Sequence, residues 1–453
     1  MQPDASSPNP PLRHRAVPRP GRFGLVQLIA VEALLLAVAT AVFGSNEEAT
    51  IVAGVLAGLL ALFTLVRAGG RWLYQAIGAR ARLGSRRAHT RAALHASADP
   101  AQAAAPGLRI RTVTDRGVSF GVGQDPDGWF AALGVLTWIG PAFERPPSLA
   151  LDRVARLLAD PVTTISALQV VTHHTAAVPQ TGTAANDLVW LAMRLDTRDA
   201  VDAAASRGGG VEGVDRALAA AVGRTGTILN GADVPSEALD ASALHHALTV
   251  SNGLYRPGGY GPADAPADAE ESWRQWTAGG LAHVCFAIRS WPAQPGPDLL
   301  EQLAATPAAA VDTAVLVTPG GGGFAVRALI RISGSPGAIA ESAKLLREHA
   351  QRLGVRLVRA DGDHGTGVYA TAPTAWTPAG PTPSAWAVAV PAPAAWAPQI
   401  TAPRARPPAL VQAPSWQPPV LGPGGPGGHA RLTPPSLTMP TLTPPTITMP
   451  RTR

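Results

Sequence analysis

The chain has 453 residues, one cysteine and a formal net charge of +6 from 37 basic and 31 acidic residues. A single cysteine excludes an intrachain disulfide framework and a multi-cysteine metal site within one copy. The excess of positive charge comes without a basic motif interleaved with aromatic residues, so it does not indicate nucleic-acid binding.

Two apolar runs, at residues 24–43 and 49–66, follow a Pro-rich segment 1–22 that we expect to be disordered. At a rise of about 1.5 Å per residue, each run makes a helix about as long as a bilayer is thick. The sequence therefore predicts a two-helix transmembrane hairpin over residues 23–67. A cleaved signal peptide is the alternative for the first run, but a second run that follows at once favours the hairpin.

Arginines flank both runs, while the short loop between them carries only Glu47 and Glu48. Basic residues near membrane ends stay on the cytoplasmic side. This predicts a plasma-membrane protein with two spans and with both its N- and C-termini in the cytoplasm. The arginines after the second run are also candidates for contact with anionic lipid of the inner leaflet, although setting the topology would explain them alone. These lipid-surface candidates are Arg71, Arg80, Arg82, Arg86 and Arg87.

Three residues inside the predicted hairpin are candidates for membrane-assembly contacts. Glu32 falls near the middle of the first run, where an ionisable group is costly unless it has a partner. A proton relay there would need ionisable companions, so contact with another helix is the preferred interpretation. Gly54 and Gly58 form a GxxxG pattern, which lets helix backbones approach closely.

A basic juxtamembrane segment and Ala-rich linker is expected at residues 68–106, followed by a cytoplasmic α/β (α+β) domain at 107–373. Alternation and turn chemistry predict its strands, and apolar periodicity predicts its helices. The strands are expected at 109–113, 118–122, 129–136, 165–171, 186–195, 282–288, 313–317, 324–332 and 355–358. For 186–195 a helix is the alternative, and a strand is preferred. The helices are expected at 148–158, 210–222, 235–248 and 335–353.

Residues 374–453 are rich in proline and contain no acidic residue, so we expect a disordered tail. Its spaced tryptophans and prolines leave open a role as ligand for a Pro-binding partner.

Three patterns resemble catalytic or metal sites without meeting the requirements of one. The glycines at 320–323 lack the Lys-Ser/Thr and the helix of a phosphate-binding loop. Asp361-Gly362-Asp363 has the carboxylates to hold a divalent metal and a sugar nucleotide, but a turn after the strand 355–358 is the preferred explanation. His173 and His174 are neighbours on an expected strand and point to opposite faces. We therefore predict no catalytic residue, no metal and no cofactor, and we interpret Cys285 as a buried structural thiol.

Three segments, taken in order, resemble the EccE component of actinobacterial type VII (ESX) secretion systems. The first runs from Asp115 to Gly128, the second is Trp276-Thr277-Ala278-Gly279-Gly280-Leu281-Ala282-His283 continuing to Trp291-Pro292, and the third is Val358 to Gly362 followed by Thr371-Ala372-Pro373. The residues that carry the family motifs are Trp276, His283, Trp291, Pro292, Asp361 and Gly362.

The resemblance implies a non-enzymatic structural subunit of the inner-membrane core complex, beside EccB, the EccC ATPase and EccD. It also implies a cytoplasmic domain like a degenerate glycosyltransferase, in which Asp361 and Asp363 are relics or plain turn residues. Docking through the hairpin and bracing of partner domains is the expected function. Two alternatives stay open: a membrane-anchored, glycosyltransferase-like sugar-nucleotide enzyme, and an adaptor that acts through the Pro-rich tail.

Overall fold

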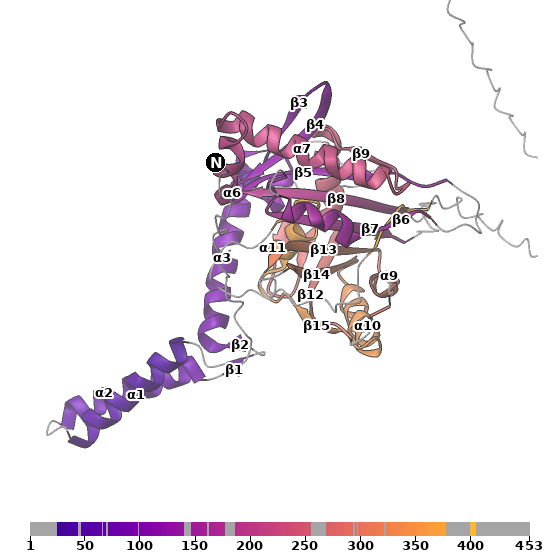
Figure 1. Cartoon of the computed structure of the whole chain (residues 1–453). Helices are drawn as coiled ribbons and strands as arrows, with labels where there is room; N and C mark the ends of the chain where they lie inside the picture. Colours follow the sequence, from indigo (N-terminus) through magenta and orange to yellow (C-terminus); the bar gives the residue numbers. More distant parts are fainter. Residues whose placement is uncertain are drawn as a thin grey trace, which may run out of the picture. The chain divides into compact units, whose positions relative to one another are not determined.

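The computed structural model describes most of the chain between Leu25 and Arg404 (Figure 1). The described ranges are 25–43, 47–65, 67–68, 71–97, 99–139, 146–160, 163–176, 186–254, 269–292, 295–296, 298–320, 323–376 and 399–404. The predicted disordered segment 1–22, and the predicted tail apart from 374–376 and 399–404, lie outside these residues.

The two apolar runs form helices α1 (Leu25–Phe43) and α2 (Glu47–Leu65), but the prediction of a transmembrane hairpin is wrong. Across the described residues, no helix combines the length and the apolar character that crossing a membrane requires. The prediction took each apolar run whole. The helices are 19 residues each; α1 includes Glu32, and α2 begins with Glu47 and Glu48.

An Arg-rich helix stands where the sequence suggested a linker. After a small two-stranded sheet of β1 (Arg67–Ala68) and β2 (Arg71–Trp72), α3 runs over Leu73–Ala96. The short α4 (Ala101–Ala104) follows and packs on α3. The helix α3 contains no acidic residue, so its arginines can be neutralised only by other parts of the chain or by a ligand.

A 12-stranded antiparallel sheet organises the rest of the described chain. Its main path runs β10-β11-β12-β14-β13-β7-β8-β5-β4-β3, with β15 added on β12 and β9 on β5. The strands are β3 (Arg109–Asp115), β4 (Val118–Asp125), β5 (Gly128–Val135), β7 (Ala167–Thr175), β8 (Asn186–Asp196), β9 (Ser236–Ala238), β10 (Ala269–Glu271), β11 (Trp276–Ala278), β12 (Leu281–Ser290), β13 (Ala310–Gly320), β14 (Gly323–Gly334) and β15 (Arg356–Arg359). All the strands expected from the sequence are present, with ends shifted by a few residues, and the domain is α+β.

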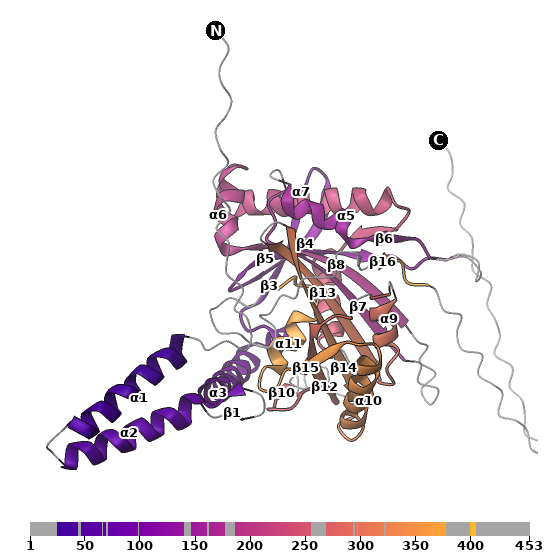
Figure 2. The same ribbon diagram turned by 60° about the horizontal axis from the view of Figure 1, so that its bottom comes forward.

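Helices lie on both sides of this sheet (Figures 1 and 2). The largest apolar cluster joins one sheet face to five helices: α5 (Leu151–Ala155), α6 (Thr197–Ala205), α7 (Gly210–Asn230), α9 (Leu299–Ala304) and α10 (Ile339–Arg352). The opposite face packs on α4, α8 (Ala241–Ser251) and α11 (His364–Ala370) in two smaller clusters. Alternation along each strand divides its residues between these two layers.

Long-range pairing changes the start of each of two expected helices. Ser148, expected to cap a helix, lies in β6 (Ser148–Ala150), and α5 begins at Leu151, before the 3-10 turn Arg156–Ala159. The partner of β6 is β16 (Gln399–Thr401), a strand inside the segment expected to be a disordered tail. Likewise β9 pairs with β5 where a helix was expected, and α8 begins after Asp240, whose carboxylate accepts a hydrogen bond from the amide of Ala243 at 2.7 Å.

Candidate functional site

The two faces of the sheet differ sharply in polarity. The face under α4, α8 and α11 carries a set of buried polar side chains, whereas the other face is covered by the main apolar cluster. This polar set is Gln169, His173, Arg194, His283, Cys285, Asp312 and Arg331. Buried charges are costly unless they are paired, so the pairing of this set decides whether it is structural or available for chemistry.

One row of four residues crosses the centre of the sheet in register. Cys285 on β12 is opposite Arg331 on β14, which is opposite Asp312 on β13, which is opposite His173 on β7. The Asp312 carboxylate accepts hydrogen bonds from Nε of Arg331 at 3.0 Å and from the ring of His173 at 2.7 Å. Arg331 also donates to the carbonyl of Ser251, at the end of α8. The row ties the sheet to the helix above it.

The charged groups of this row are compensated by one another, as in a structural core. Burial by itself would raise the pKa of Asp312, but the Arg331 guanidinium and His173 outweigh burial and hold the pKa at about 2. Burial raises the pKa of the Cys285 thiol to about 12, so the thiol stays protonated at neutral pH. The interpretation of Cys285 as a buried structural thiol agrees with its full burial in β12.

A second buried pair joins β8 to β4. Two terminal nitrogens of Arg194 donate to the carboxylate of Asp125 at 2.9 and 2.6 Å, and the Tyr369 hydroxyl donates to the same carboxylate at 2.7 Å. Burial alone would raise the pKa of Asp125, but Arg194 and Tyr369 overcome it and lower the pKa. Asp125 also accepts from the amides of Asp127 and Gly128, which makes the turn expected from the sequence.

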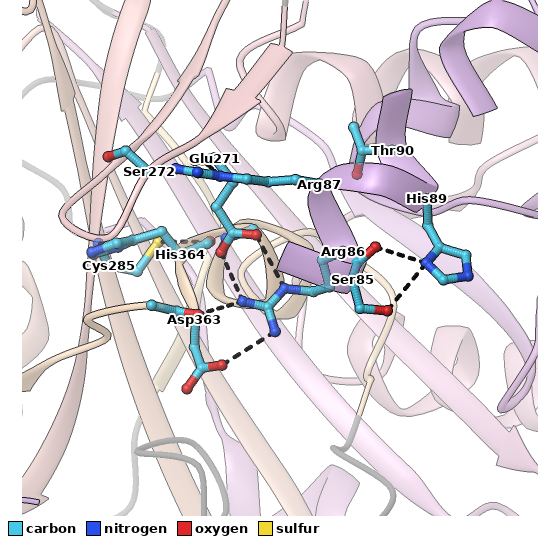
Figure 3. A network of polar contacts seen from close by, with 12 residues as sticks. Ser85, Arg86, Arg87, His89, Thr90, Glu271, Ser272, Cys285, Asp363 and His364 are labelled. Atoms are coloured by element: carbon cyan, nitrogen blue, oxygen red, sulfur yellow. Dashed lines mark hydrogen bonds and ion pairs between the residues drawn. The ribbon is translucent and has the colours of Figure 1, made fainter. Parts of the chain in front are cut away.

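The third group of charges, which we call the α3 junction, joins α3 to the edge of the sheet (Figure 3). Arg86 donates from Nε and Nη2 to the two oxygens of Glu271, each at 3.0 Å, and from Nη1 to Asp363 at 3.3 Å. It also donates to the carbonyl of Gly362. The side chains of Glu271 and Asp363 are only 3% and 4% exposed, so one arginine neutralises two buried carboxylates.

Neighbouring contacts extend the α3 junction into the domain. Arg87, the next residue on α3, donates from Nε to the backbone carbonyl of Glu271. The amide of Gly365, in the first turn of α11, donates to Glu271 at 2.8 Å. The ring of His364 accepts from the amide of Cys285 at 3.3 Å, and its burial lowers its pKa despite the nearby Asp361. Glu271 therefore holds α3, β10 and α11 together.

Gly362 has a steric role in the α3 junction. Its φ is +75°, and a Cβ atom there would lie 2.5 Å from the ring of Trp273. Its amide donates to the carbonyl of Trp273 at 2.7 Å, while its own carbonyl accepts from Arg86. Only glycine adopts this backbone conformation without cost while leaving space for the indole.

The other residues of the family motifs also lie at positions where they support the fold. Trp276 and His283 are directly opposite each other in the hairpin of β11 and β12, whose two-residue turn is Gly279-Gly280 with φ of +59° and +81°. Such a turn requires positive φ at both positions, which explains the glycines of this motif. His283 is buried beside Ser333, 2.7 Å from its hydroxyl. Trp291 packs against the main core, and Pro292 lies next to Gly354 after α10.

The carboxylates of the Asp361-Gly362-Asp363 triplet do not converge. Asp361 accepts from Nε of Arg359 at 2.6 Å, whereas Asp363 pairs with Arg86. His173 and His174 also diverge, as expected, with His174 paired to Asp187. Within the described part of the chain, no group of three or more His, Cys, Asp or Glu side chains is arranged to hold a metal ion.

The residues predicted to contact lipid and to mediate assembly lie on different elements: the arginines on β2 and α3, Glu32 on α1, and Gly54 and Gly58 on α2. Arg80, Arg82 and Arg87 are exposed or half-exposed on α3, whereas Arg86 is taken up by the α3 junction; Arg71 lies in β2, and its side chain is outside the described set. Glu32 is exposed on α1, and Gly54 and Gly58 are exposed on α2 with open space around them. Their proposed roles in lipid contact and assembly stay predictions.

The sequence analysis did not identify several residues that make the key contacts of the candidate site. Glu271, Trp273 and Asp312 sit in stretches without a motif, and their partners are far away along the chain. One signal was available: Arg331 lies between the apolar residues Ile330 and Ile332 of its strand, and a buried arginine requires a buried carboxylate.

Fold and site together define the class: an α+β sheet protein, built on one large antiparallel sheet, that is fastened through buried ion pairs to an Arg-rich helix. Residues 183–288 match the family model described as "Putative type VII ESX secretion system translocon, EccE". The resemblance to EccE is therefore confirmed over this region, which contains Glu271, Trp276 and His283 and is similar to part of a type VII secretion translocon component. No curated protein matches the chain.

Proposed function

We propose that the chain is a non-enzymatic structural subunit of the core complex of a type VII secretion system at the plasma membrane. In this proposal α1 and α2 dock on partner subunits and the sheet domain braces partner domains on the cytoplasmic side. The family match to a translocon component supports the general role. The partners are those implied by the family resemblance, namely EccB, the EccC ATPase and EccD.

The observation that carries the proposal is the exposure of large apolar side chains on α1 and α2. Leu36 and Leu35 on α1 are 68% and 63% exposed, and Ile51 and Leu56 on α2 are both 61% exposed. An apolar surface of this kind marks a contact with another apolar body. Gly54 and Gly58 add exposed positions where a partner helix could approach closely, and Glu32 adds a polar one.

The α3 junction supports the bracing role. Only residues 66–72 connect α2 to α3, and α3 is fastened to the sheet domain by Arg86, whose two carboxylate partners are almost fully buried. A force or displacement that reaches α3 therefore meets buried, charge-assisted hydrogen bonds rather than a flexible linker.

Two observations favour a structural role over catalysis. The carboxylates that resembled a metal and sugar-nucleotide site are each bound by an arginine of the same chain. The Cys285 thiol has a pKa raised to about 12 by burial, which does not suit a nucleophile. Among the described residues, no specific contact favours the sugar-nucleotide enzyme or the tail adaptor, so neither is proposed.

Co-purification tests this function. The tagged full chain is expressed with its cognate translocon subunits and isolated in a mild detergent. We expect an FtsK-like ATPase and a multi-span subunit to co-purify with it, and the double variant Leu36→Asp, Leu56→Asp to lose both. Val201→Asp is the matched control, because Val201 is 70% exposed on α6 of the sheet domain. Isolation of the wild-type chain as a lone monomer would contradict the proposal.

A further inference from the structure

A cavity of about 490 Å³ lies between α3 and the loop that follows β10. Its lining residues are Arg80, Leu83, Gly84, Arg87 and Trp273. The cavity adjoins the α3 junction, because Arg87 also donates to the carbonyl of Glu271 and Trp273 packs on Gly362. The contacts that fix α3 to the domain therefore also fix the cavity walls.

The two arginines of the cavity are not neutralised by the described part of the chain. The Arg80 guanidinium lies 4.8 Å from the centroid of the Trp273 ring, and none of the described carboxylates forms an ion pair with Arg80 or Arg87. The hydrogen bond of Arg87 to the chain uses Nε, so among the described contacts its two terminal nitrogens are not engaged. Adjacent Arg86 and Arg87 thus differ: Arg86 is bound to carboxylates, and Arg87 faces the cavity.

We propose that this cavity binds a phosphate group between the guanidinium groups of Arg80 and Arg87. Guanidinium groups bind phosphate oxygens through paired, charge-assisted hydrogen bonds, and stacking on an indole holds such a group in a fixed orientation. The ring of Trp273 and the side chain of Leu83 form an apolar wall, which suits a phosphate attached to an organic group. The source of the phosphate is either the headgroup of an anionic lipid or a soluble phosphate. The site is independent of the subunit role proposed above, because it requires no partner chain.

Native mass spectrometry of the full chain in mild detergent measures retained phosphatidylglycerol, and calorimetry with inorganic phosphate measures the soluble source. We expect the wild-type chain to bind at least one of the two, and Arg80→Gln, Arg87→Gln to weaken that binding about ten-fold or more. Binding of phosphatidylglycerol alone assigns a lipid headgroup, and binding of inorganic phosphate with the same dependence on the variant assigns a soluble phosphate.

The matched control is Arg82→Gln, Arg91→Gln, which removes the same charge from α3 outside the cavity lining. It should keep wild-type binding. If the change at Arg87 disturbs the α3 junction, the single variant Arg80→Gln still tests the site. Among the described residues Arg80 contacts Trp273 and takes no part in the α3 junction, so Arg80→Gln should weaken binding on its own. Equal loss of binding in the two double variants, or no binding of either ligand by the wild-type chain, would overturn the proposal.

Discussion

Asp312 accepts a hydrogen bond from Nε of Arg331 at 3.0 Å in the middle of the sheet, and the two side chains are 0% and 1% exposed. Replacing Asp312 by Leu would leave Arg331 buried without its counter-ion. Removing one partner of a buried pair costs about 3–5 kcal/mol, so we expect a loss of this size in the free energy of unfolding. Urea denaturation of the full chain, followed by tryptophan fluorescence, measures it.

The double variant Asp312→Leu, Arg331→Met separates the two explanations of that loss. When both charges are replaced by apolar groups of similar size, the desolvation cost disappears with them, so stability should return close to the wild-type value. A double variant as unstable as Asp312→Leu alone would show that packing, rather than the uncompensated charge, explains the loss.

His283 makes the stability of the fold depend on pH. Its burial, with a smaller contribution from Arg331, lowers its pKa from 6.5 to about 3. Between these values the unfolded chain binds a proton that the folded chain excludes, so stability is lost as pH falls. The expected contribution is about 1.4 kcal/mol per pH unit across this window. Denaturation at a series of pH values should give His283→Gln a smaller slope in this window than the wild-type chain, and an unchanged slope would contradict the prediction.

Gly362 allows a clash to be separated from backbone strain. Its φ is +75° and a Cβ would lie 2.5 Å from the Trp273 ring, while Gly280 has φ +81° with nothing within 4 Å of its Cβ position. Alanine at either position should cost about 1–2 kcal/mol from the left-handed backbone. Gly362→Ala should cost a further 1–3 kcal/mol, roughly, because the ring must move. Thermal unfolding of both variants measures the difference, and equal costs would mean that Trp273 moves freely.

Local sequence patterns were enough to predict most strands of the sheet, but they did not predict which distant parts of the chain contact one another. Alternation in 324–332 and the turn residues at 125–128 identified β14 and the hairpin of β4 and β5, because those signals lie within the elements themselves. The α3 junction could not be found this way. Arg86 and Glu271 are 185 positions apart, and an arginine cluster after two apolar runs has an equally good explanation in membrane topology.

The wrong predictions also arose because they were made from local sequence patterns. Ser148 has the chemistry of a helix cap, yet it pairs with Thr401 in a short sheet, because a partner strand far along the chain overrides the local preference. The runs 24–43 and 49–66 were judged by their length and by how few charged residues they contain. The helices that form have ionisable residues inside their bounds, and among the described residues they do not amount to membrane spans.

The short strand β16 lies within residues 374–453, which the composition predicted to be a disordered tail. The side chain of Ile400 is fully buried and joins the main core, and the amide of Trp138 donates to the carbonyl of Pro403 at 2.8 Å. Ile400→Ala should lower the free energy of unfolding by about 2–5 kcal/mol, because it leaves a cavity in a packed core. The control is Gln399→Ala, an exposed neighbour on the same strand, which should change stability by less than about 0.5 kcal/mol. Chemical denaturation of both full-length variants decides the point, and a loss at Ile400 no larger than that at Gln399 would mean that β16 does not belong to the folded core.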